Sequence, residues 1–327
     1  MKRLDNYWNS HNAVSIALWP ISLVFSLLAW VRRCAYRVGL LRQCKLPVPV
    51  IVVGNISVGG TGKTPLVIWL VEYLISLGYK PGIVARGYGA QIGKTPRQVN
   101  PESSAEEVGD EPLLITRRTG CPMVVAPNRV AAARMLLEKN DCDVIVSDDG
   151  MQHYALGRDI EIAVVDGQRR FGNGCCLPAG PLREPLSRLA SVDLVIANGI
   201  SEINEHSMQT IIGKAVNLGN PELAHNLEEF AGEEVHALAG IGYPQRFFQL
   251  LKDHGLQLIE WDFPDHHRFV KADITPDDDL LVFMTEKDAV KCRHFAQPRH
   301  WYLPIDVSVD DAFSNRLAEL LRGLKGG

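Results

Sequence analysis

The run Val48-Pro-Val-Ile-Val-Val53 is followed directly by Gly54-Asn-Ile-Ser-Val-Gly-Gly-Thr-Gly-Lys-Thr64. The first run is short and rich in β-branched residues, which is typical of a strand buried on both faces. After the glycine-rich run, apolar residues recur at helical spacing from Pro65 to Leu77, and a proline is tolerated in a first helical turn. Strand, glycine-rich loop and helix in this order indicate a phosphate-binding loop.

The residue types in this loop are suited to binding a nucleoside triphosphate. Glycines let backbone N–H groups converge on phosphate oxygens, and the helix N-terminus adds partial positive charge. Lys63 is predicted to reach the β- and γ-phosphates and Thr64 to ligate Mg²⁺. The predicted ATP-binding residues are Ser57, Val58, Gly59, Gly60, Thr61, Gly62, Lys63 and Thr64. Ser57 replaces the first glycine of the common pattern, and Val58 stands where partition-type switch ATPases carry a second lysine, which argues against that class.

Two carboxylates follow a second buried-strand pattern, Asp143 to Ser147. In P-loop folds an aspartate at a strand end holds Mg²⁺, directly or through water, so Asp148 and Asp149 are predicted metal ligands. A solvated Asp-Gly turn is the plainer alternative. A later loop dense in glycine and proline supplies Arg183, predicted to neutralise phosphoryl charge, and Glu184, predicted to reach the metal.

A kinase that acts on a sugar hydroxyl needs a side chain that accepts the proton. The segments Gly109-Asp-Glu-Pro112 and Asp265-His-His-Arg-Phe269 offer Asp110 and His266 as a coupled pair, although each segment alone fits an ordinary loop. Arg86, which follows a strand pattern, and Arg129 are candidates for anion binding or, equally, for a solvated surface.

Composition sets the limits for these candidates. The chain has 327 residues, 46% hydrophobic and 22% charged, which is ordinary for a globular protein of two domains. A net charge of −4 gives no global basic excess for binding a nucleic-acid backbone, so no nucleic-acid partner is expected. Seven cysteines without CxxC spacing argue against a disulfide scaffold or a zinc ribbon.

The N-terminal region reads as a membrane-associated helix. Ala13 to Val31 lacks charged side chains, and its nineteen residues in helical form would extend about 28 Å, close to the hydrocarbon thickness of a bilayer. Trp8 and Trp30 flank the run, Lys2 and Arg3 precede it, and basic residues follow it. The alternatives are a signal peptide, for which the cleavage site is poor, and a buried core helix. A spanning helix and one lying in the interface both remain open.

Beyond this helix, strand and helix patterns alternate, which predicts an α/β fold with a mainly parallel sheet. The composition turns polar and acidic around Pro221 to Glu234, and a new strand–loop–helix pattern then begins. The predicted organisation is a membrane-associated helix over residues 1–33, a P-loop domain over 34–225 and a smaller α/β domain over 226–327. Gly240-Ile-Gly242 lacks the third glycine of a dinucleotide fingerprint, so NAD is not expected.

Taken together, these motifs resemble one family, the tetraacyldisaccharide 4′-kinases of lipid A biosynthesis. The segments that carry the resemblance are Val53-Gly-Asn55, Gly59-Gly-Thr-Gly-Lys-Thr-Pro65, Arg86-Gly-Tyr88, Gly109-Asp-Glu-Pro112, Asp148-Asp-Gly-Met-Gln-His153, Leu177-Pro-Ala-Gly-Pro-Leu-Arg-Glu184, Ala239-Gly-Ile-Gly242, Asp265-His-His-Arg-Phe269 and Thr285-Glu-Lys-Asp288. They extend over nearly the whole chain and occur in one fixed order, which makes the resemblance specific.

The resemblance implies ATP-dependent phosphorylation of the 4′-hydroxyl of a tetraacylated glucosamine disaccharide 1-phosphate, giving lipid IV-A. It implies Asp110 as the catalytic base assisted by His266, with Mg²⁺ near Thr64, Asp148, Asp149 and Glu184, and a location on the cytoplasmic face of the bacterial inner membrane. Lys63 and Arg183 complete the predicted catalytic residues. The predicted substrate-binding residues are Asn55, Arg86, Arg129, Gln152 and His153. A monomer is expected.

Two other functions fit the residues less completely. A membrane-associated P-loop switch ATPase would hydrolyse ATP in response to a protein partner and phosphorylate no lipid. A cytosolic small-molecule kinase would use the first helix merely as core and would need no detergent. Both keep the phosphate-binding loop, but neither accounts for the ordered set of motifs.

Overall fold

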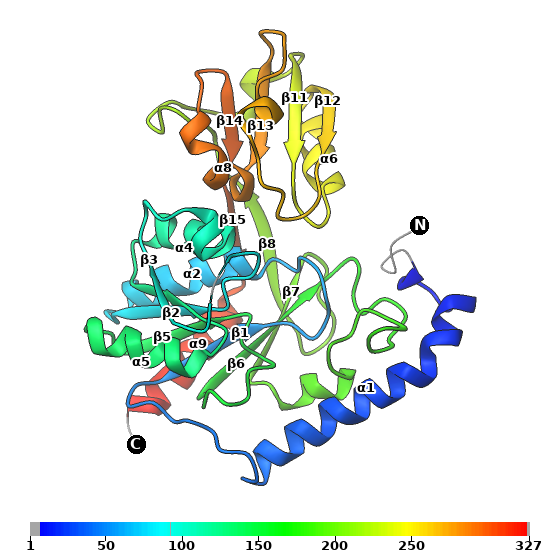
Figure 1. Ribbon diagram of the computed structural model, residues 1–327, viewed down its shortest axis with the longest axis vertical. Helices are drawn as coiled ribbons and strands as arrows, with labels where there is room; N and C mark the ends of the chain where they lie inside the picture. Colours follow the sequence, from blue (N-terminus) through cyan, green and yellow to red (C-terminus); the bar gives the residue numbers. More distant parts are fainter. Residues whose placement is uncertain (1–6, 92, 326–327) are drawn as a thin grey trace.

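Two β-sheets, one above the other in Figure 1, organise the chain. The computed structural model describes residues 7–91 and 93–325. Lys2 and Arg3, expected to flank the apolar run, lie outside the described residues.

Nine strands of the described residues form the larger sheet, in the order β15-β8-β7-β6-β1-β5-β2-β4-β3. The strands from β8 to β4 in this order are parallel, and β15 and β3 pair antiparallel at the two edges. Their bounds are β1 (Val50–Gly54), β2 (Pro81–Ala85), β3 (Arg97–Val99), β4 (Met123–Val125), β5 (Val144–Asp148), β6 (Ile160–Asp166), β7 (Leu194–Asn198), β8 (His206–Ile212) and β15 (Ile305–Val309). The predicted mainly parallel α/β fold is confirmed.

Both faces of this sheet are covered, which explains the nearly continuous apolar strands. Ile51 and Val53 of β1 point to the face covered by α2, α4 and α9, whereas Val50 and Val52 point to the face covered by α5. The helices of this unit are α2 (Lys63–Ser76), α3 (Ala105–Val108), α4 (Asp110–Thr119), α5 (Arg129–Lys139) and α9 (Asp311–Lys325). Alternate residues of one strand therefore enter two separate cores.

The smaller sheet has the order β10-β9-β14-β13-β11-β12 in the part of the chain described. Its strands are β9 (Ala215–Asn217), β10 (Ala224–His225), β11 (Glu234–Ala239), β12 (Gln257–Asp262), β13 (Leu281–Thr285) and β14 (His300–Leu303), and its helices are α6 (Gln245–Asp253), α7 (Lys271–Ile274) and α8 (Glu286–Cys292). Phe247, Phe248 and Leu251 of α6 pack with Phe283 of β13 in the core of this second unit.

The strand pairing differs from the predicted boundary near residue 225 and from the assignment of all later residues to the second unit. The chain enters the second sheet at β9 and returns to the first at β15, which pairs with β8. Phe313 and Leu317 of α9 then belong to the core of the first unit. The acidic segment around Pro221 to Glu234 lies between strands of the second sheet, because polar loops occur within units as well as between them.

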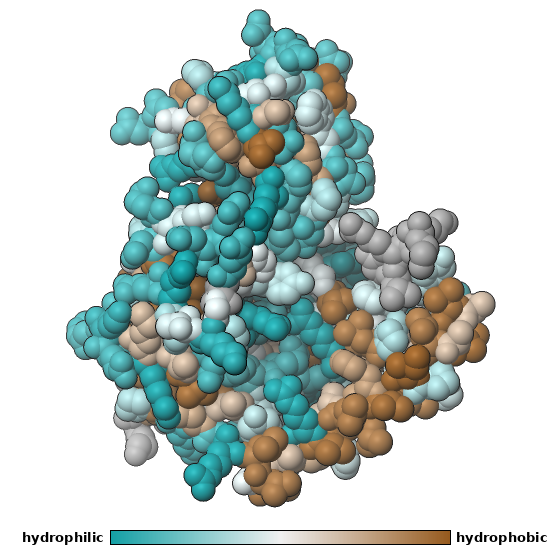
Figure 2. All heavy atoms as spheres, in the orientation of Figure 1, coloured by the Kyte–Doolittle hydropathy of each residue, from teal (hydrophilic) through white to brown (hydrophobic). Residues whose placement is uncertain are grey.

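The apolar N-terminal run forms α1 (Ala13–Arg37), which lies along the side of the first unit (Figure 1). One stripe touches protein: Ser22 is buried and donates through Oγ to the carbonyl of Cys176 at 2.5 Å, and Phe25 packs on the core. The opposite side exposes large apolar residues, which are Ile16, Trp19, Ile21, Leu23, Val24, Leu27, Leu28, Trp30 and Val31. In Figure 2 hydrophobic side chains accordingly gather along α1. The helix is long and apolar enough to cross a membrane. Only 11% of its most apolar 18-residue stretch is buried, which argues against a core helix.

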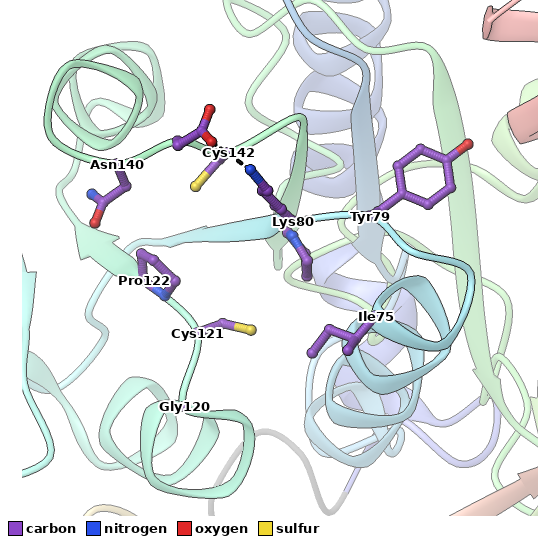
Figure 3. A pocket seen from close by; sticks show the side chains of 10 residues that line it. Ile75, Tyr79, Lys80, Gly120, Cys121, Pro122, Asn140 and Cys142 are labelled. Atoms are coloured by element: carbon purple, nitrogen blue, oxygen red, sulfur yellow. Dashed lines mark hydrogen bonds and ion pairs between the residues drawn. The ribbon is translucent and has the colours of Figure 1, made fainter.

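A cavity of about 320 Å³ opens at the N-terminal ends of three strands of the larger sheet (Figure 3). Pro81, Pro122 and Cys142, which line it, stand at or just before the N-terminal ends of β2, β4 and β5. The phosphate-binding loop follows the C-terminal end of β1, so this cavity is remote from it.

Candidate active site

The glycine-rich loop joins β1 to α2 at the C-terminal edge of the larger sheet, the edge where ligands bind in open α/β folds. Gly59 and Gly62 have φ of +99° and +91°, left-handed values that favour glycine, and Gly62 is the N-cap of α2. The amide of Val58 donates to Pro181 O at 2.9 Å, which fixes the loop to the 175–185 segment. A Cβ added to Gly60 would meet open space, so the loop presents a free face to a ligand.

Two cations converge on Asp149 beside this loop. The Nζ of Lys63 lies 3.5 Å from Oδ1 of Asp149, and Nη1 of Arg183 lies 3.1 and 3.0 Å from its two oxygens. Burial opposes ionisation of Asp149, but these charges lower its pKa below the ordinary value. Its φ of +46° is uncommon for a non-glycine residue and is typical of functional sites. The structure therefore brings Lys63, Arg183 and Asp149 together as predicted.

Asp148 has the features of a cation ligand. It is buried at the end of β5, its Oδ1 has no hydrogen-bond partner, and burial together with Glu111 and Asp149 raises its pKa to about 7. A bound cation would satisfy the free oxygen and reverse this shift. Among the described residues no three His, Cys, Asp or Glu side chains gather into a metal site of their own. This fits Mg²⁺, which is usually bound by one or two carboxylates together with substrate phosphates.

Glu184 makes different contacts from those expected. Its carboxylate accepts from the Tyr154 hydroxyl at 2.7 Å and lies 3.0 Å from Nε of Arg188, within a buried cluster that also holds Glu161. One oxygen, Oε1, is buried without a partner. The role of Glu184 at the metal therefore stays a prediction that depends on this single free oxygen.

The predicted substrate residues gather at the ends of β1, β2 and β5. Gln152 donates through Nε2 to Asn55 O at 3.0 Å, and Arg129 donates through Nη2 to Asp149 O at 3.3 Å. Burial, followed by the charge of Arg129, lowers the pKa of His153 to about 4. Burial lowers the pKa of Arg129 to about 10, and exposed Arg86 adds to this by its charge.

Unsatisfied polar atoms mark the same region. They are Asn55 Oδ1, Arg129 Nε and His153 Nε2. Buried polar atoms normally have partners, so three orphans beside a crowded set of cations indicate a place for an anionic, hydrogen-bonding ligand.

Asp110 and His266 meet across the two units. Asp110 is the first residue of α4 in the first unit, and His266 lies in the loop after β12 in the second. Nδ1 of His266 is 3.0 Å from both carboxylate oxygens of Asp110. This hydrogen bond raises the pKa of His266, and together with nearby lysines it lowers the pKa of buried Asp110 despite desolvation. The predicted coupled pair is therefore present as a contact.

The pair and the phosphate site share one edge of the sheet. Gly109, directly before Asp110, packs against the backbone of Gly87 and Tyr88 just after β2, and β2 pairs with β5, which carries Asp148. The charge of neighbouring Glu111 raises the pKa of Asp148. The Asp110 carboxylate, the cations around Asp149 and the open glycine loop thus lie at adjacent strand ends.

A second contact between the units lies beside the glycine loop, and sequence reasoning did not find it. Asp166 at the end of β6 binds Arg169 at 2.8 Å and Arg246 of α6 at 3.1 Å. Arg169 also donates to the carbonyl of Gly60, and both guanidinium groups lie over the ring of Tyr243. The sequence offered only an indirect signal. Arg169 and Tyr243 lie in glycine-rich loops, and Asp166 and Arg246 stand in the elements next to them, but no sequence pattern pairs these residues.

Comparisons with known proteins agree with this geometry. A family model described as tetraacyldisaccharide-1-P 4′-kinase matches residues 14–322. The tetraacyldisaccharide 4′-kinase of Nitrosococcus oceani is 50% identical, with 97% of this chain and 93% of that protein covered, and the one of Alkalilimnicola ehrlichii is 48% identical, with 97% and 94% covered. A crystal structure of LpxK from Aquifex aeolicus in complex with ATP has a TM-score of 0.79 at 28% identity, covering 94% of this chain and 99% of that one.

These matches confirm the family and the enzyme class expected from the motifs, and they do not favour a membrane-associated switch ATPase. The similarity extends over both units rather than over the phosphate-binding loop alone. The chain belongs to the tetraacyldisaccharide 4′-kinase family.

Proposed function

We propose that this protein transfers the γ-phosphoryl group of ATP to the 4′-hydroxyl of a tetraacylated glucosamine disaccharide 1-phosphate, which gives lipid IV-A. The observation that carries the proposal is the contact between His266 and Asp110, 3.0 Å long, at the edge of the sheet that also presents the glycine loop. This contact supports Asp110 as the proton acceptor for a sugar hydroxyl that attacks the terminal phosphate.

In this mechanism Asp110 accepts the proton of the 4′-hydroxyl as its oxygen attacks phosphorus. Asp110 is held ionised, so its carboxylate is an acceptor, and His266 orients it through a hydrogen bond to both oxygens. The imidazole also tunes the basicity of the carboxylate, because a protonated partner withdraws negative charge from it. His266 has a φ of +60°, so its loop is held in an uncommon conformation that directs the ring at Asp110.

The phosphates of ATP would lie on residues 57–64, with Lys63 on the transferring group and Arg183 neutralising its charge. Both cations bind Asp149, which keeps them ordered beside the loop where phosphate oxygens would lie. Asp148, Asp149 and Thr64 would hold Mg²⁺, with Glu184 as a further ligand through Oε1. The ion would neutralise phosphate charge.

The headgroup of the substrate would be bound by Asn55, Arg86, Arg129, Gln152 and His153. Its phosphate suits the guanidinium groups of Arg86 and Arg129, since arginine matches phosphate geometry with two parallel donors. The orphan atoms Arg129 Nε and His153 Nε2 are a donor and a second ring nitrogen that a sugar phosphate can satisfy.

An acylated substrate resides in a bilayer, and α1 fits such a surface. One stripe of α1 contacts protein through Ser22 and Phe25, whereas its other side is apolar and exposed (Figure 2). A helix with one face on protein and one apolar face lies in the interface plane rather than spanning alone. We place the protein on the cytoplasmic face of the inner membrane, because the basic residues that follow the apolar run would be attracted to the anionic lipids of that leaflet. It would act as a monomer, since one chain supplies both Asp110 and His266.

The decisive experiment measures transfer of labelled γ-phosphate from ATP to the purified acylated disaccharide in mixed micelles with Mg²⁺. We expect a phosphorylated lipid from the wild-type protein, and loss of turnover by at least 10²-fold in Lys63→Ala, because a preorganised charge at the phosphoryl group is removed. Lys80→Ala is the matched control, since Lys80 forms an exposed pair with Asp141. Folded protein that hydrolyses ATP without labelling the lipid would contradict the proposal.

A further inference from the structure

The segment Thr285-Glu-Lys-Asp288 ends β13 and begins α8, and the function described so far gives it no role. Every one of its side chains is engaged. Thr285 accepts from the amide of Asp288 as the N-cap of α8, and Asp288 accepts from the amide of Gly240 at 2.8 Å. Glu286 binds Arg118 near the end of α4 at 3.0 Å, and Lys287 binds Glu111 near the start of α4 at 3.0 Å. Neighbouring residues of α8 thus hold both ends of the helix that carries Asp110.

Lys287 is the most connected of these side chains. Its Nζ lies 3.0 Å from Glu111, 3.4 Å from Asp265 and 3.8 Å from Asp110. Glu111 and Asp110 belong to the first unit, whereas Asp265 directly precedes His266 in the second. One ammonium group therefore links carboxylates from both units at the place where the two units form the Asp110–His266 contact.

Burial makes this arrangement costly to lose. The side chain of Lys287 is 18% exposed and that of Asp110 is 5% exposed. Without the ammonium, the carboxylates of Asp110, Glu111 and Asp265 would face one another with less compensation, and like charges at this range repel in a partly desolvated site. The repulsion would act between α4 and the His266 loop, so it would separate the two partners of the catalytic pair.

We propose that Lys287 is a positioning residue for phosphoryl transfer: its ammonium cross-links Asp110 and Glu111 of α4 to Asp265 of the His266 loop, and so holds the catalytic base against His266. The inference rests on the proposed function for its meaning in catalysis, but the contact it describes is a property of the fold. Lys287 would act through Asp110, from which its Nζ is 3.8 Å away.

Lys291 is a second cation in the same place with a different role. Its Nζ lies 2.7 Å from Asp288 and 4.0 Å from Asp110, and it stands over the ring of Phe269. Its main partner is on its own helix, so Lys291 contributes charge but does not link the units. Of these two lysines, Lys287 is therefore the one whose closest contact, to Glu111, joins the second unit to the first.

The charged groups around Asp110 and His266 predict in which direction the pKa of His266 changes when Lys287 is replaced. Asp110 faces His266, Lys287 and Lys291, while His266 faces Asp110, Asp265 and Lys287. The hydrogen bond to Asp110 is the largest cause of the raised pKa of His266, and the charge of Lys287 opposes it. Removing Lys287 therefore has two opposite effects: loss of the contact lowers the pKa of His266, whereas loss of the charge alone raises it.

The test compares full-length wild type, Lys287→Met, Lys287→Arg and the control Lys252→Met in mixed micelles. Lys252 pairs with Glu260 on the surface of the same unit. An imidazole NMR titration follows the pKa of His266, whose signal is assigned by its loss in His266→Gln. We expect Lys287→Met to lower that pKa toward the ordinary value and Lys287→Arg to restore it. In the kinase assay we expect kcat to fall on the order of 10²-fold in Lys287→Met, since a displaced base costs about this much, with KM for ATP unchanged.

A rise in the pKa of His266 in Lys287→Met would show an effect of charge alone and would overturn the positioning role. An unchanged pKa of His266, or a kcat equal to that of the wild type, would also overturn it. If Lys287→Met does not fold, Lys287→Gln replaces it, and we expect the same falls in the pKa of His266 and in kcat. The titration needs no substrate, so a protein that phosphorylates no lipid and yet shows the fall refutes the proposed function and supports the cross-link. A protein that phosphorylates the lipid but shows no fall in the pKa of His266 in Lys287→Met supports the proposed function and refutes the cross-link.

Discussion

Nδ1 of His266 lies 3.0 Å from each carboxylate oxygen of Asp110, although 156 positions separate the two residues and they belong to different units. The contact joins the loop after β12 to the start of α4, so it depends on how the two units pack together. We therefore expect His266 to hold the proposed base, Asp110, only while the two units are in contact.

Replacing Asp110 tests the base directly. We expect Asp110→Asn to lower kcat by on the order of 10²–10⁴-fold, the usual range for a general base, because the amide accepts no proton. ATP binding, measured by calorimetry, should persist, since the glycine loop is untouched. Asp278→Asn is the matched control, because Asp278 also pairs with a histidine, His236, but within the second unit. Equal kcat in Asp110→Asn and wild type would refute the assignment.

The pH dependence follows from His266. Its folded pKa is raised above 6.5 by the hydrogen bond to Asp110, so the ion pair stabilises the closed form fully below 6.5 and loses this contribution as pH rises through the raised value. Once the imidazole is neutral, Asp110 is the stronger base. We expect kcat to rise with pH through this pKa, and His266→Gln to remove that rise while retaining more activity than Asp110→Asn. An unchanged profile in His266→Gln would exclude His266 as the titrating group.

The exposed face of α1 predicts membrane affinity. Leu23→Glu and Leu27→Glu should each weaken binding to phospholipid vesicles by about 1.5–3 kcal/mol, the value of burying one leucine. Flotation with vesicles measures the bound fraction. Ile203→Glu is the control, since Ile203 is 91% exposed but lies far along the chain from α1. Equal losses in all three variants would show that the effect is not specific to α1.

A buried ion cluster beneath the site predicts stability. Arg188, whose side chain is 2% exposed, makes two hydrogen bonds to Glu161 of 2.6 and 2.7 Å. Arg188→Met leaves Glu161 with one cation, Arg158, and we expect a loss of about 3–5 kcal/mol in the free energy of unfolding. The exposed pair of Arg316 and Glu319 is the control, with a change of about 0–1 kcal/mol in Arg316→Met. Urea unfolding measures both, and equal losses would contradict the argument.

Contiguous patterns carried most of what the sequence could predict. Val48 to Thr64 predicted a buried strand, a glycine loop and a helix start, because each depends on residues close together in the chain. The polar segments themselves offered Asp110 and His266 as a candidate pair, and the family resemblance added their roles as base and assisting residue. Helix α1 was likewise evident from its uncharged run.

What the sequence did not show depends on packing between distant elements. The contacts of Lys287 with Glu111 and of Asp166 with Arg246 form only because α8 and α6 are placed against the first unit. The expected metal role of Glu184 overlooked Tyr154 and Arg188, which the fold brings to it. Strand β15, by which the chain returns to the larger sheet, has five residues and is separated from β14 by one proline. Such a short pattern does not show to which of the two sheets the strand belongs.

That return has a consequence for how the molecule is assembled. Ile212 and Ile305, the last residue of β8 and the first of β15, are direct cross-strand partners, so the second unit is an insertion at the tip of a hairpin. During synthesis β8 therefore has no β15 to pair with until the whole second unit has been made. Conversely, excising residues 213–304 and bridging the gap with a two-residue turn would leave an ordinary hairpin and a self-contained nucleotide-binding half from which His266 has been removed.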